Sequence, residues 1–254
     1  MKTALVTGAS RGIGKAVALR LARDGFAVAV NFRTRAAEAD AVVEAIHASG
    51  GRAIAIQADV QQAGQVARMA AEIRSKLGDP EVLINNAGVV SRGDLDDFDF
   101  SQMNAMRGTN VDGLVHVTRA FIGGMKTAGY GRIVNLTSIA AHGTSMPGTT
   151  FYAATKAAVS VLTRRFAMDL GVHGITVNAI APGFILTDMA FDGRTPEQIE
   201  QVCSGVAAKT MVRRVGKPEE IASAVSFLAS EQAGFITAQV LTIDGGRMNY
   251  ITHP

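Results

Sequence analysis

The sequence predicts an α/β fold: a single doubly wound domain of the Rossmann type over residues 1–254, in which a seven-stranded parallel sheet carries helices on both faces. Three observations predict it. Short runs rich in β-branched residues alternate with longer segments of helical period, as in parallel strands joined by crossover helices. The strand-like runs are apolar throughout, which suits a sheet covered on both faces. No linker rich in Pro, Gly and Ser and no internal repeat divides the chain.

Each element follows from this alternation. The strands are expected at 3–8, 26–31, 52–57, 81–85, 132–138, 175–180 and 240–244, and the main helices at about 12–24, 35–49, 62–77, 108–127, 151–171 and 218–229. Glycine and proline mark several boundaries, such as Gly50-Gly51 after the second helix and Pro182-Gly183 after the sixth strand. In an open sheet of this kind, the ligand site is expected beyond the carboxyl ends of the strands.

Composition excludes several classes of protein. Apolar residues make up 48 % of the chain and charged residues 19 %, which excludes a disordered chain. Lys and Arg are interleaved with acids and the net charge is only +3, so no nucleic-acid partner is expected. No stretch approaches the roughly 18 apolar residues of a membrane span. The single cysteine, Cys203, fits a reducing compartment, and we expect a soluble cytoplasmic protein. The histidines lack the spacing of metal ligands, so no metal is expected.

The connection between the first strand and the first helix is rich in glycine, and we expect it to bind a dinucleotide. Glycines there permit a tight turn and close approach to a pyrophosphate, and the helix N-terminus supplies N–H donors. The spacing is GxxxGxG, and an ordinary strand-to-helix turn is the alternative interpretation. The cofactor-binding residues expected in this turn are Gly8, Ser10, Arg11, Gly12, Ile13 and Gly14.

The end of the second strand predicts which dinucleotide binds. NAD-specific folds place a carboxylate there for the ribose 2′-hydroxyl. Residues 29–36 contain no acid, and Asn31, Arg33 and Arg35 stand in this region. Because a 2′-phosphate requires cationic donors, we expect NADP(H) rather than NAD(H), with Arg11 and Arg33 as contacts. Arg35 is interpreted as a solvated residue at a helix start.

Tyr152 and Lys156 are the candidate catalytic pair. They stand at i and i+4 and therefore share one face of a predicted helix. A neighbouring ammonium stabilises tyrosinate and lowers the tyrosine pKa, which makes Tyr152 a candidate proton donor to a carbonyl. Ser138 ends the preceding strand, where its hydroxyl reaches a substrate oxygen. Asn110 is expected to open the helix before that strand.

Together these motifs resemble the short-chain dehydrogenase/reductase family, and within it the 3-oxoacyl-(acyl-carrier-protein) reductases. The resemblance covers essentially the whole chain. The matching motifs, in the family's order, are TGASRGIG (7–14), Asp59-Val60, NNAG (85–88), Asn110, Ser138, YAATK (152–156), Asn178, PGFILT (182–187), RVGKPEEIA (214–222) and DGG (244–246).

The resemblance implies reduction of a ketone to a secondary alcohol. Hydride comes from the nicotinamide, Tyr152 donates the proton, Ser138 orients the carbonyl, Lys156 binds the ribose, and Asn110 holds a relay water. It also implies a substrate lid at about 184–212 and a homotetramer built through helices 108–127 and 151–171 and the last strand. The further cofactor contacts that it implies are Asp59, Val60, Asn86, Ala87, Gly88, Pro182, Gly183, Ile185 and Thr187.

The sequence departs from the family pattern at a few places, which leaves the substrate open. Ser138 and Tyr152 are 14 positions apart, one more than expected, and Ala238 stands where glycine is usual. Gly129 and His173 stand where carrier-protein reductases often have basic residues. The expected substrate is therefore a small-molecule or acyl-thioester ketone. The alternatives are a sugar, polyol or other secondary-alcohol dehydrogenase and, more remotely, a non-catalytic dinucleotide sensor.

Overall fold

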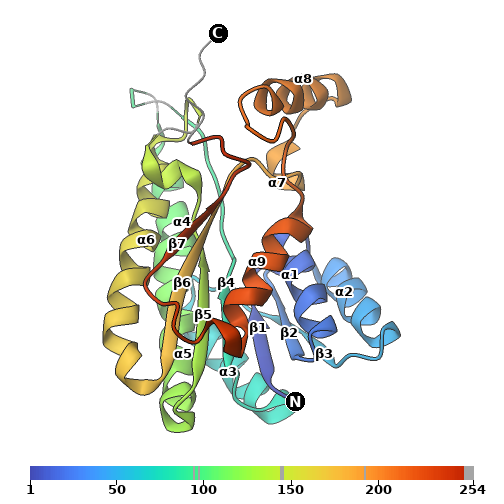
Figure 1. The fold of residues 1–254 in the computed structure, drawn as a ribbon, viewed down its shortest axis with the longest axis vertical. Coiled ribbons are helices and arrows are strands. Elements are labelled where there is room, and N and C mark those ends of the chain that lie inside the picture. Colours follow the sequence, from blue (N-terminus) through green and yellow to red (C-terminus); the bar gives the residue numbers. More distant parts are fainter. Residues whose placement is uncertain (94, 97, 144–145, 192, 249–254) are drawn as a thin grey trace.

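Seven parallel strands cross the centre of the molecule in the computed structural model, in the order β3-β2-β1-β4-β5-β6-β7 (Figure 1). The structure describes residues 1–93, 95–96, 98–143, 146–191 and 193–248. The strand order reverses between β1 and β4, and such a reversal opens a crevice at the carboxyl ends of the strands. The strands are β1 (Thr3–Val6), β2 (Ala27–Phe32), β3 (Ala53–Gln57), β4 (Val82–Asn85), β5 (Gly131–Leu136), β6 (Ile175–Pro182) and β7 (Val240–Ile243).

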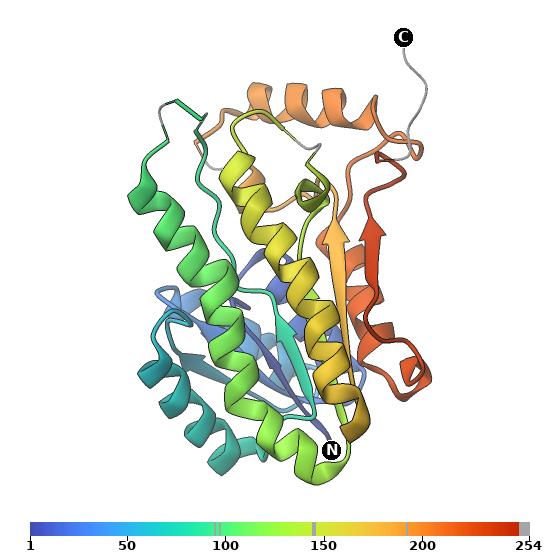
Figure 2. The ribbon, with the colours of Figure 1, turned by 90° about the vertical axis from the view of Figure 1, so that its left-hand side faces the viewer.

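Helices cover both faces of this sheet (Figures 1 and 2). The first face packs against α1 (Gly12–Arg23), α2 (Ala36–Ala48) and α9 (Pro218–Ala229). The second packs against α3 (Ala63–Leu77), α5 (Gly113–Ala128) and α6 (Thr150–Leu170). Successive side chains of β1 serve the two cores in turn, since Ala4 and Val6 face the first and Leu5 the second, all fully buried. Because each face of β1 meets a core, the strand is buried along its whole length, as its apolar sequence predicted.

All seven predicted strands form, with shifted ends. The first ends at Val6, because Thr7 and Gly8 leave the sheet for the glycine turn, and the sixth continues to Pro182. No helix within the described part of the chain is long and apolar enough to cross a membrane.

The predicted start of the helix at 108 is wrong. Helical backbone begins earlier, with α4 (Phe100–Arg107), and continues through a π-helical turn, Gly108–Asp112, into α5. Asp99 caps α4 by accepting a hydrogen bond from the backbone N–H of Ser101 (2.8 Å). Gly108 adopts ordinary helical angles (φ −55°, ψ −43°), so the helical backbone continues through it. Asn110 therefore lies in the middle of a long helix and does not open one.

The segment after β6 contains two helices whose bounds the sequence analysis did not predict. These are α7 (Asp188–Phe191) and α8 (Pro196–Ala207), and a capping box of Thr195 and Gln198 fixes the start of α8. Both helices stand at the end of the molecule where the strands have their carboxyl ends (Figure 1).

Candidate active site

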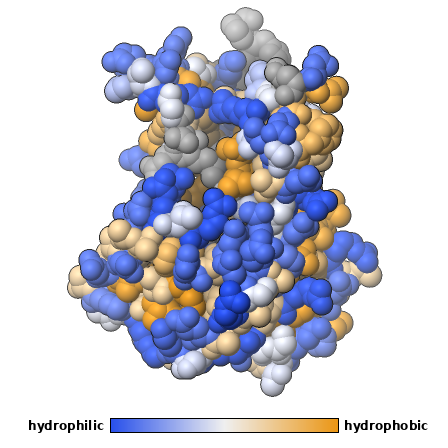
Figure 3. Space-filling model, turned by 180° about the vertical axis from the view of Figure 1, so that it is seen from behind, coloured by the Kyte–Doolittle hydropathy of each residue, from blue (hydrophilic) through white to orange (hydrophobic). Residues whose placement is uncertain are grey.

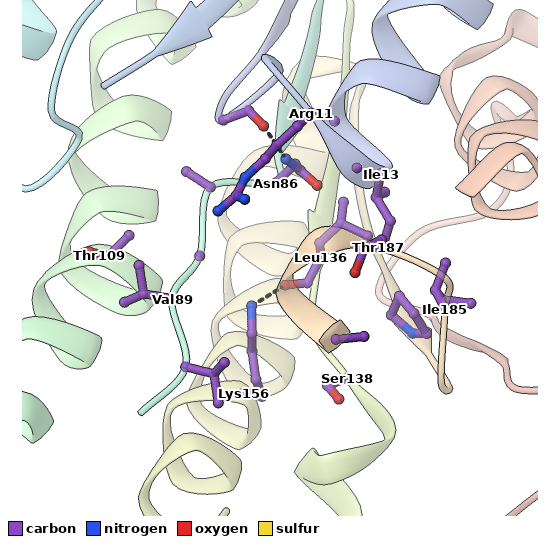
Figure 4. A pocket seen from close by; sticks show the side chains of 18 of the residues that line it. Arg11, Ile13, Asn86, Val89, Thr109, Leu136, Ser138, Lys156, Ile185 and Thr187 are labelled. Atoms are coloured by element: carbon purple, nitrogen blue, oxygen red, sulfur yellow. Dashed lines mark hydrogen bonds between the residues drawn. The ribbon is translucent and has the colours of Figure 1, made fainter. Parts of the chain in front are cut away.

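A cavity of about 390 Å³ opens at the carboxyl ends of the strands. Its lining runs from the glycine turn to the segment after β6, and it includes every site residue expected from the sequence except Asn110. Arg11 and Lys156 approach this space from opposite ends (Figure 4). The structure therefore gathers the residues of several separate sequence motifs around one cavity.

The glycine turn leaves its backbone open to the cavity. Gly12 has a positive φ of +55°, a conformation that favours glycine. A Cβ on Gly14 would lie 2.4 Å from the carbonyl oxygen of Gly8, so no larger side chain fits without displacing the backbone. Helix α1 begins here, its first residues line the cavity, and the unpaired N–H groups of a helix start favour an anion.

Two asparagine side chains brace this turn. The Asn86 amide donates to the carbonyl oxygens of Thr7 (2.8 Å) and Gly8 (3.0 Å). The carbonyl oxygen of the Asn31 side chain accepts from the N–H of Gly8 (3.2 Å), and its amide donates to the carbonyl oxygen of Ala58 (3.1 Å). Both residues line the cavity, but their amide groups hold the turn in place.

The end of the cavity that Arg11 lines, opposite Lys156, is basic. Arg33 is exposed at the end of β2 and lines the cavity with Arg11. Arg35, interpreted from the sequence as merely solvated, also lines it and pairs with Glu38 (2.8 Å). This ion pair holds the pKa of the Glu38 carboxyl below its ordinary value. Asp59 is the acid in the lining, and its carboxylate accepts from the N–H of Gln61 (3.0 Å).

Ser138, Tyr152 and Lys156 come together at the other end. The Ser138 hydroxyl accepts from the N–H of Ala140 (3.1 Å) and acts to lower the pKa of the Tyr152 phenol. The Lys156 ammonium is buried, donates to the carbonyl oxygen of Leu136 (2.8 Å) and lies 5.8 Å from the centre of the Tyr152 ring (Figure 4).

Loss of hydration sets the direction of the pKa shift for both Tyr152 and Lys156. It raises the pKa of Tyr152 to about 12, against the opposing effect of the Ser138 hydrogen bond. It also lowers the pKa of Lys156 to about 8, because the charged form loses hydration. The pKa of Tyr152 is therefore raised overall, whereas the sequence analysis expected Lys156 to lower it. At neutral pH the phenol holds its proton.

Polar contacts fix the position of α6 on the sheet. The Thr137 hydroxyl donates to the carbonyl oxygen of Lys156 (2.7 Å). Deeper in the core, the Asn135 amide donates to the Thr163 hydroxyl (2.9 Å). Because these groups are buried, a shifted helix would leave them unpaired, at a cost of about 1–3 kcal/mol each.

Asn110 lies outside the cavity and joins two parts of its wall. Its amide donates to the carbonyl oxygen of Val89 (3.0 Å) and to the Thr155 hydroxyl (2.9 Å), and its side-chain oxygen accepts from the N–H of Val89 (2.8 Å). Thr155 in turn donates to the carbonyl oxygen of Tyr152 (2.8 Å). The π-helical turn, a feature common at functional sites, places Asn110 there.

The family is decided by a match over nearly the whole chain. A family model described as enoyl-(acyl carrier protein) reductase matches residues 8–248. The chain belongs to the short-chain dehydrogenase/reductase family. As a member, it is an NAD(P)-dependent dehydrogenase or reductase.

Several members of this family are similar along their whole length. The 3-oxoacyl-(acyl-carrier-protein) reductase of Staphylococcus epidermidis is 40 % identical over 96 % of this chain and 98 % of its own. That of Synechocystis is 40 % identical over 98 % of each. Among solved structures, gluconate 5-dehydrogenase of Burkholderia cenocepacia, in complex with NADP and tartrate, has a TM-score of 0.90 at 31 % identity, covering 98 % of this chain and 96 % of that one.

In this short-chain dehydrogenase/reductase, the cavity also has lining residues that sequence reasoning missed or left undecided. Most stand directly beside a recognised motif at a strand end, and this position was the signal that could have found them. Thr144 and Ser145, in the lengthened loop, lie outside the described residues. The additional lining residues are Phe32, Thr34, Ala58, Val89, Val90, Arg92, Thr109, Leu136, Thr137, Ile139, Ala140, Met146, Thr149, Phe184, Ala190 and Arg247.

Proposed function

We propose that this enzyme uses NADPH to reduce a ketone to a secondary alcohol, with 3-oxoacyl thioesters as its substrate class. The observation that carries the proposal is that Ser138, Tyr152 and buried Lys156 line the same cavity as the glycine turn. The names of the 40 % identical relatives support the substrate class.

The residues of the cavity fit a dinucleotide. The glycine turn at the start of α1 lines the cavity, and Gly14 lies so close to the Gly8 carbonyl oxygen that a Cβ has no room there. The glycine turn would hold the pyrophosphate, Asp59 and Val60 the adenine, and Ile185 and Thr187 the carboxamide. Arg11 and Arg33 would hold a 2′-phosphate, and no acid stands at the end of β2 to favour NAD. The NADP-bound gluconate 5-dehydrogenase supports this preference.

The side chains at the catalytic end supply the proton chemistry. When bound, the reduced nicotinamide supplies hydride to the carbonyl carbon. Tyr152, protonated at neutral pH, donates its proton to the carbonyl oxygen, which Ser138 holds by a hydrogen bond. The Lys156 ammonium stabilises the tyrosinate that remains, and the phenol then recovers a proton from solvent. Asn110 acts as a positioning residue through Val89 and Thr155.

We further propose that segment 184–212 closes over the substrate as a lid and that the enzyme works in the cytoplasm as a homotetramer. The lid is supported by Phe184 and Ala190, which line the cavity. A single thiol fits a reducing compartment. The tetramer is supported by apolar side chains left exposed on α6 and beside β7, among them Val161, Met168 and Phe235.

A second candidate function is oxidation of a sugar acid or other secondary alcohol. The gluconate 5-dehydrogenase structure favours it, as does the additional residue between Ser138 and Tyr152.

A cofactor and substrate panel tests these proposals. We expect rapid NADPH oxidation with acetoacetyl thioesters, slower oxidation of NADH, and little turnover of crotonyl thioesters, which offer a carbon–carbon double bond instead of a ketone. A higher kcat/KM for gluconate than for any thioester would establish the second candidate. Cofactor binding without turnover of any substrate would indicate a dinucleotide sensor.

A further inference from the structure

We propose that Arg92 and Arg247 supply the charge that binds an anionic group of the substrate in this cavity, so that the ketone substrate carries a carboxylate or phosphate beyond its reacting carbonyl. This inference rests on the proposed function and specifies its substrate. Both arginines line the same cavity as Ser138 and Tyr152.

The two side chains come from different walls of the cavity. Arg92 follows β4, and its neighbour Gly93 donates to the carbonyl oxygen of Gly148 (3.2 Å), which ties this loop to the one before α6. Arg247 follows β7, in a turn that packs on the end of the proposed lid. A Cβ on Gly246 would lie 2.7 Å from the Met211 sulfur. Seen from behind, the upper end of the molecule is hollowed between two projecting parts rimmed by hydrophilic side chains (Figure 3).

Neither cation belongs to the set of residues expected to hold the cofactor phosphates. Arg33 follows β2, whereas Arg247 follows the edge strand β7, and β1, β4, β5 and β6 lie between them in the sheet. The phosphates of a dinucleotide would lie at the glycine turn and at Arg11 and Arg33. Arg92 and Arg247 therefore have a charge to offer to another ligand.

The carboxylate of Asp244, close to Arg247 in the sequence, is used by the backbone of its own turn. The Asp244 carboxylate accepts from the N–H groups of Gly246 (2.9 Å) and Met248 (2.7 Å), which fixes the turn that carries Arg247. Other arginines, such as Arg74 and Arg214, form ion pairs, but no described carboxylate forms one with Arg92 or Arg247.

The chemistry of the two groups defines their ligand. A guanidinium presents a planar fork of N–H donors that matches carboxylate and phosphate oxygens. Apolar side chains of Ile139, Met146 and Phe184 line the same cavity. The matching substrate has a ketone, an apolar segment and an anionic end. A free oxo acid supplies a carboxylate at that end, and a pantetheine thioester supplies a phosphate.

Two matched pairs of substrates test the subsite and distinguish its sources. The first compares 5-oxohexanoate with its methyl ester, and the second compares acetoacetyl-coenzyme A with the phosphate-free N-acetylcysteamine thioester. We expect wild-type kcat/KM to be higher for the charged member of one pair. Arg247→Ala and Arg92→Ala should remove that advantage by about tenfold to a hundredfold through KM, and leave the neutral member within about twofold.

Arg68→Ala on α3 is the matched control, because it removes one exposed arginine away from the cavity and should change neither pair. Arg247→Lys, which keeps the charge but loses the fork, should restore part of the advantage. Equal wild-type efficiency within both pairs, or equal losses for charged and neutral substrates in the variants, would overturn the subsite while leaving ketone reduction intact. Absence of turnover with all four substrates would contradict the proposed function itself.

Discussion

Burial of Tyr152 and Lys156 determines which proton each holds. The Tyr152 pKa of about 12 keeps the phenol protonated, as a proton donor must be, whereas the Lys156 pKa of about 8 places its charge change near physiological pH. These directions depend on how far each group is removed from water, so the i, i+4 spacing of the two residues could not predict the upward shift of the Tyr152 pKa.

The rate of ketone reduction should therefore fall as pH rises through about 8. Lys156 is charged below this value and neutral above it, and the neutral amine no longer stabilises tyrosinate. A profile of single-turnover rate against pH should show a plateau below about 8 and a decline above it. Lys156→Met should abolish the step. A wild-type rate that stays flat to high pH contradicts this role.

Ala238 is a second residue whose conformation matters, because its φ of +61° is one that glycine adopts more readily. The sequence already identified this position as a departure from the family. Ala238→Gly should raise the free energy of unfolding by about 0.5–1 kcal/mol, since relief of strain exceeds the added entropy of the unfolded chain. The urea midpoint measures the change, and a lower midpoint would show that the alanine is unstrained.

Among the elements, the glycine turn is the one that sequence predicted best. Its residues sit where a strand becomes a helix, and local spacing was enough to find it. The π-helical turn at Gly108–Asp112 was not predictable in the same way. Its backbone is held by contacts with distant segments, such as Asn110 with Val89 and Thr155, and no local pattern encodes these. Arg92 and Arg247 were missed because they are far apart in the sequence and only the fold places both on one cavity.

Gly14→Ala should weaken NADPH binding by tenfold or more. The new methyl group would lie 2.4 Å from the Gly8 carbonyl oxygen and 2.5 Å from the Asn86 amide nitrogen, so the turn must move. Titration of NADPH fluorescence measures the Kd. Gly64→Ala in α3 is the control, because the nearest atom to its Cβ is the end of the Arg68 side chain, at 3.9 Å. Equal affinity of Gly14→Ala and wild type would show that the cofactor does not lie on this turn.

The whole molecule leaves apolar side chains on its outer surface, and these predict its assembly. Met168 and Val161 on α6 are 68 % and 57 % exposed, although α6 packs its other face on the core. Met168→Glu should reduce the oligomer to a smaller species in light scattering after gel filtration, with an unchanged circular dichroism spectrum. Ala37→Glu on α2, also exposed, should not. Wild-type protein that elutes as a monomer would exclude the tetramer.

The seven parallel strands with helices on both faces followed from the alternation of elements and the apolar strands, whereas their order in the sheet was not predicted. The position of α7 and α8 over the open end was not predicted either, since their sequence combines short helical runs with turns.

The most direct test of the account is the Tyr152→Phe variant under saturating NADPH and an acetoacetyl thioester. Removing one hydroxyl from the half-buried phenol removes the proton donor while keeping the ring and its packing. We predict a fall in the single-turnover rate of about 10²–10⁴-fold, with the Kd for NADPH within about twofold of wild type. A variant that reduces the ketone at the wild-type rate would contradict the central role of Tyr152.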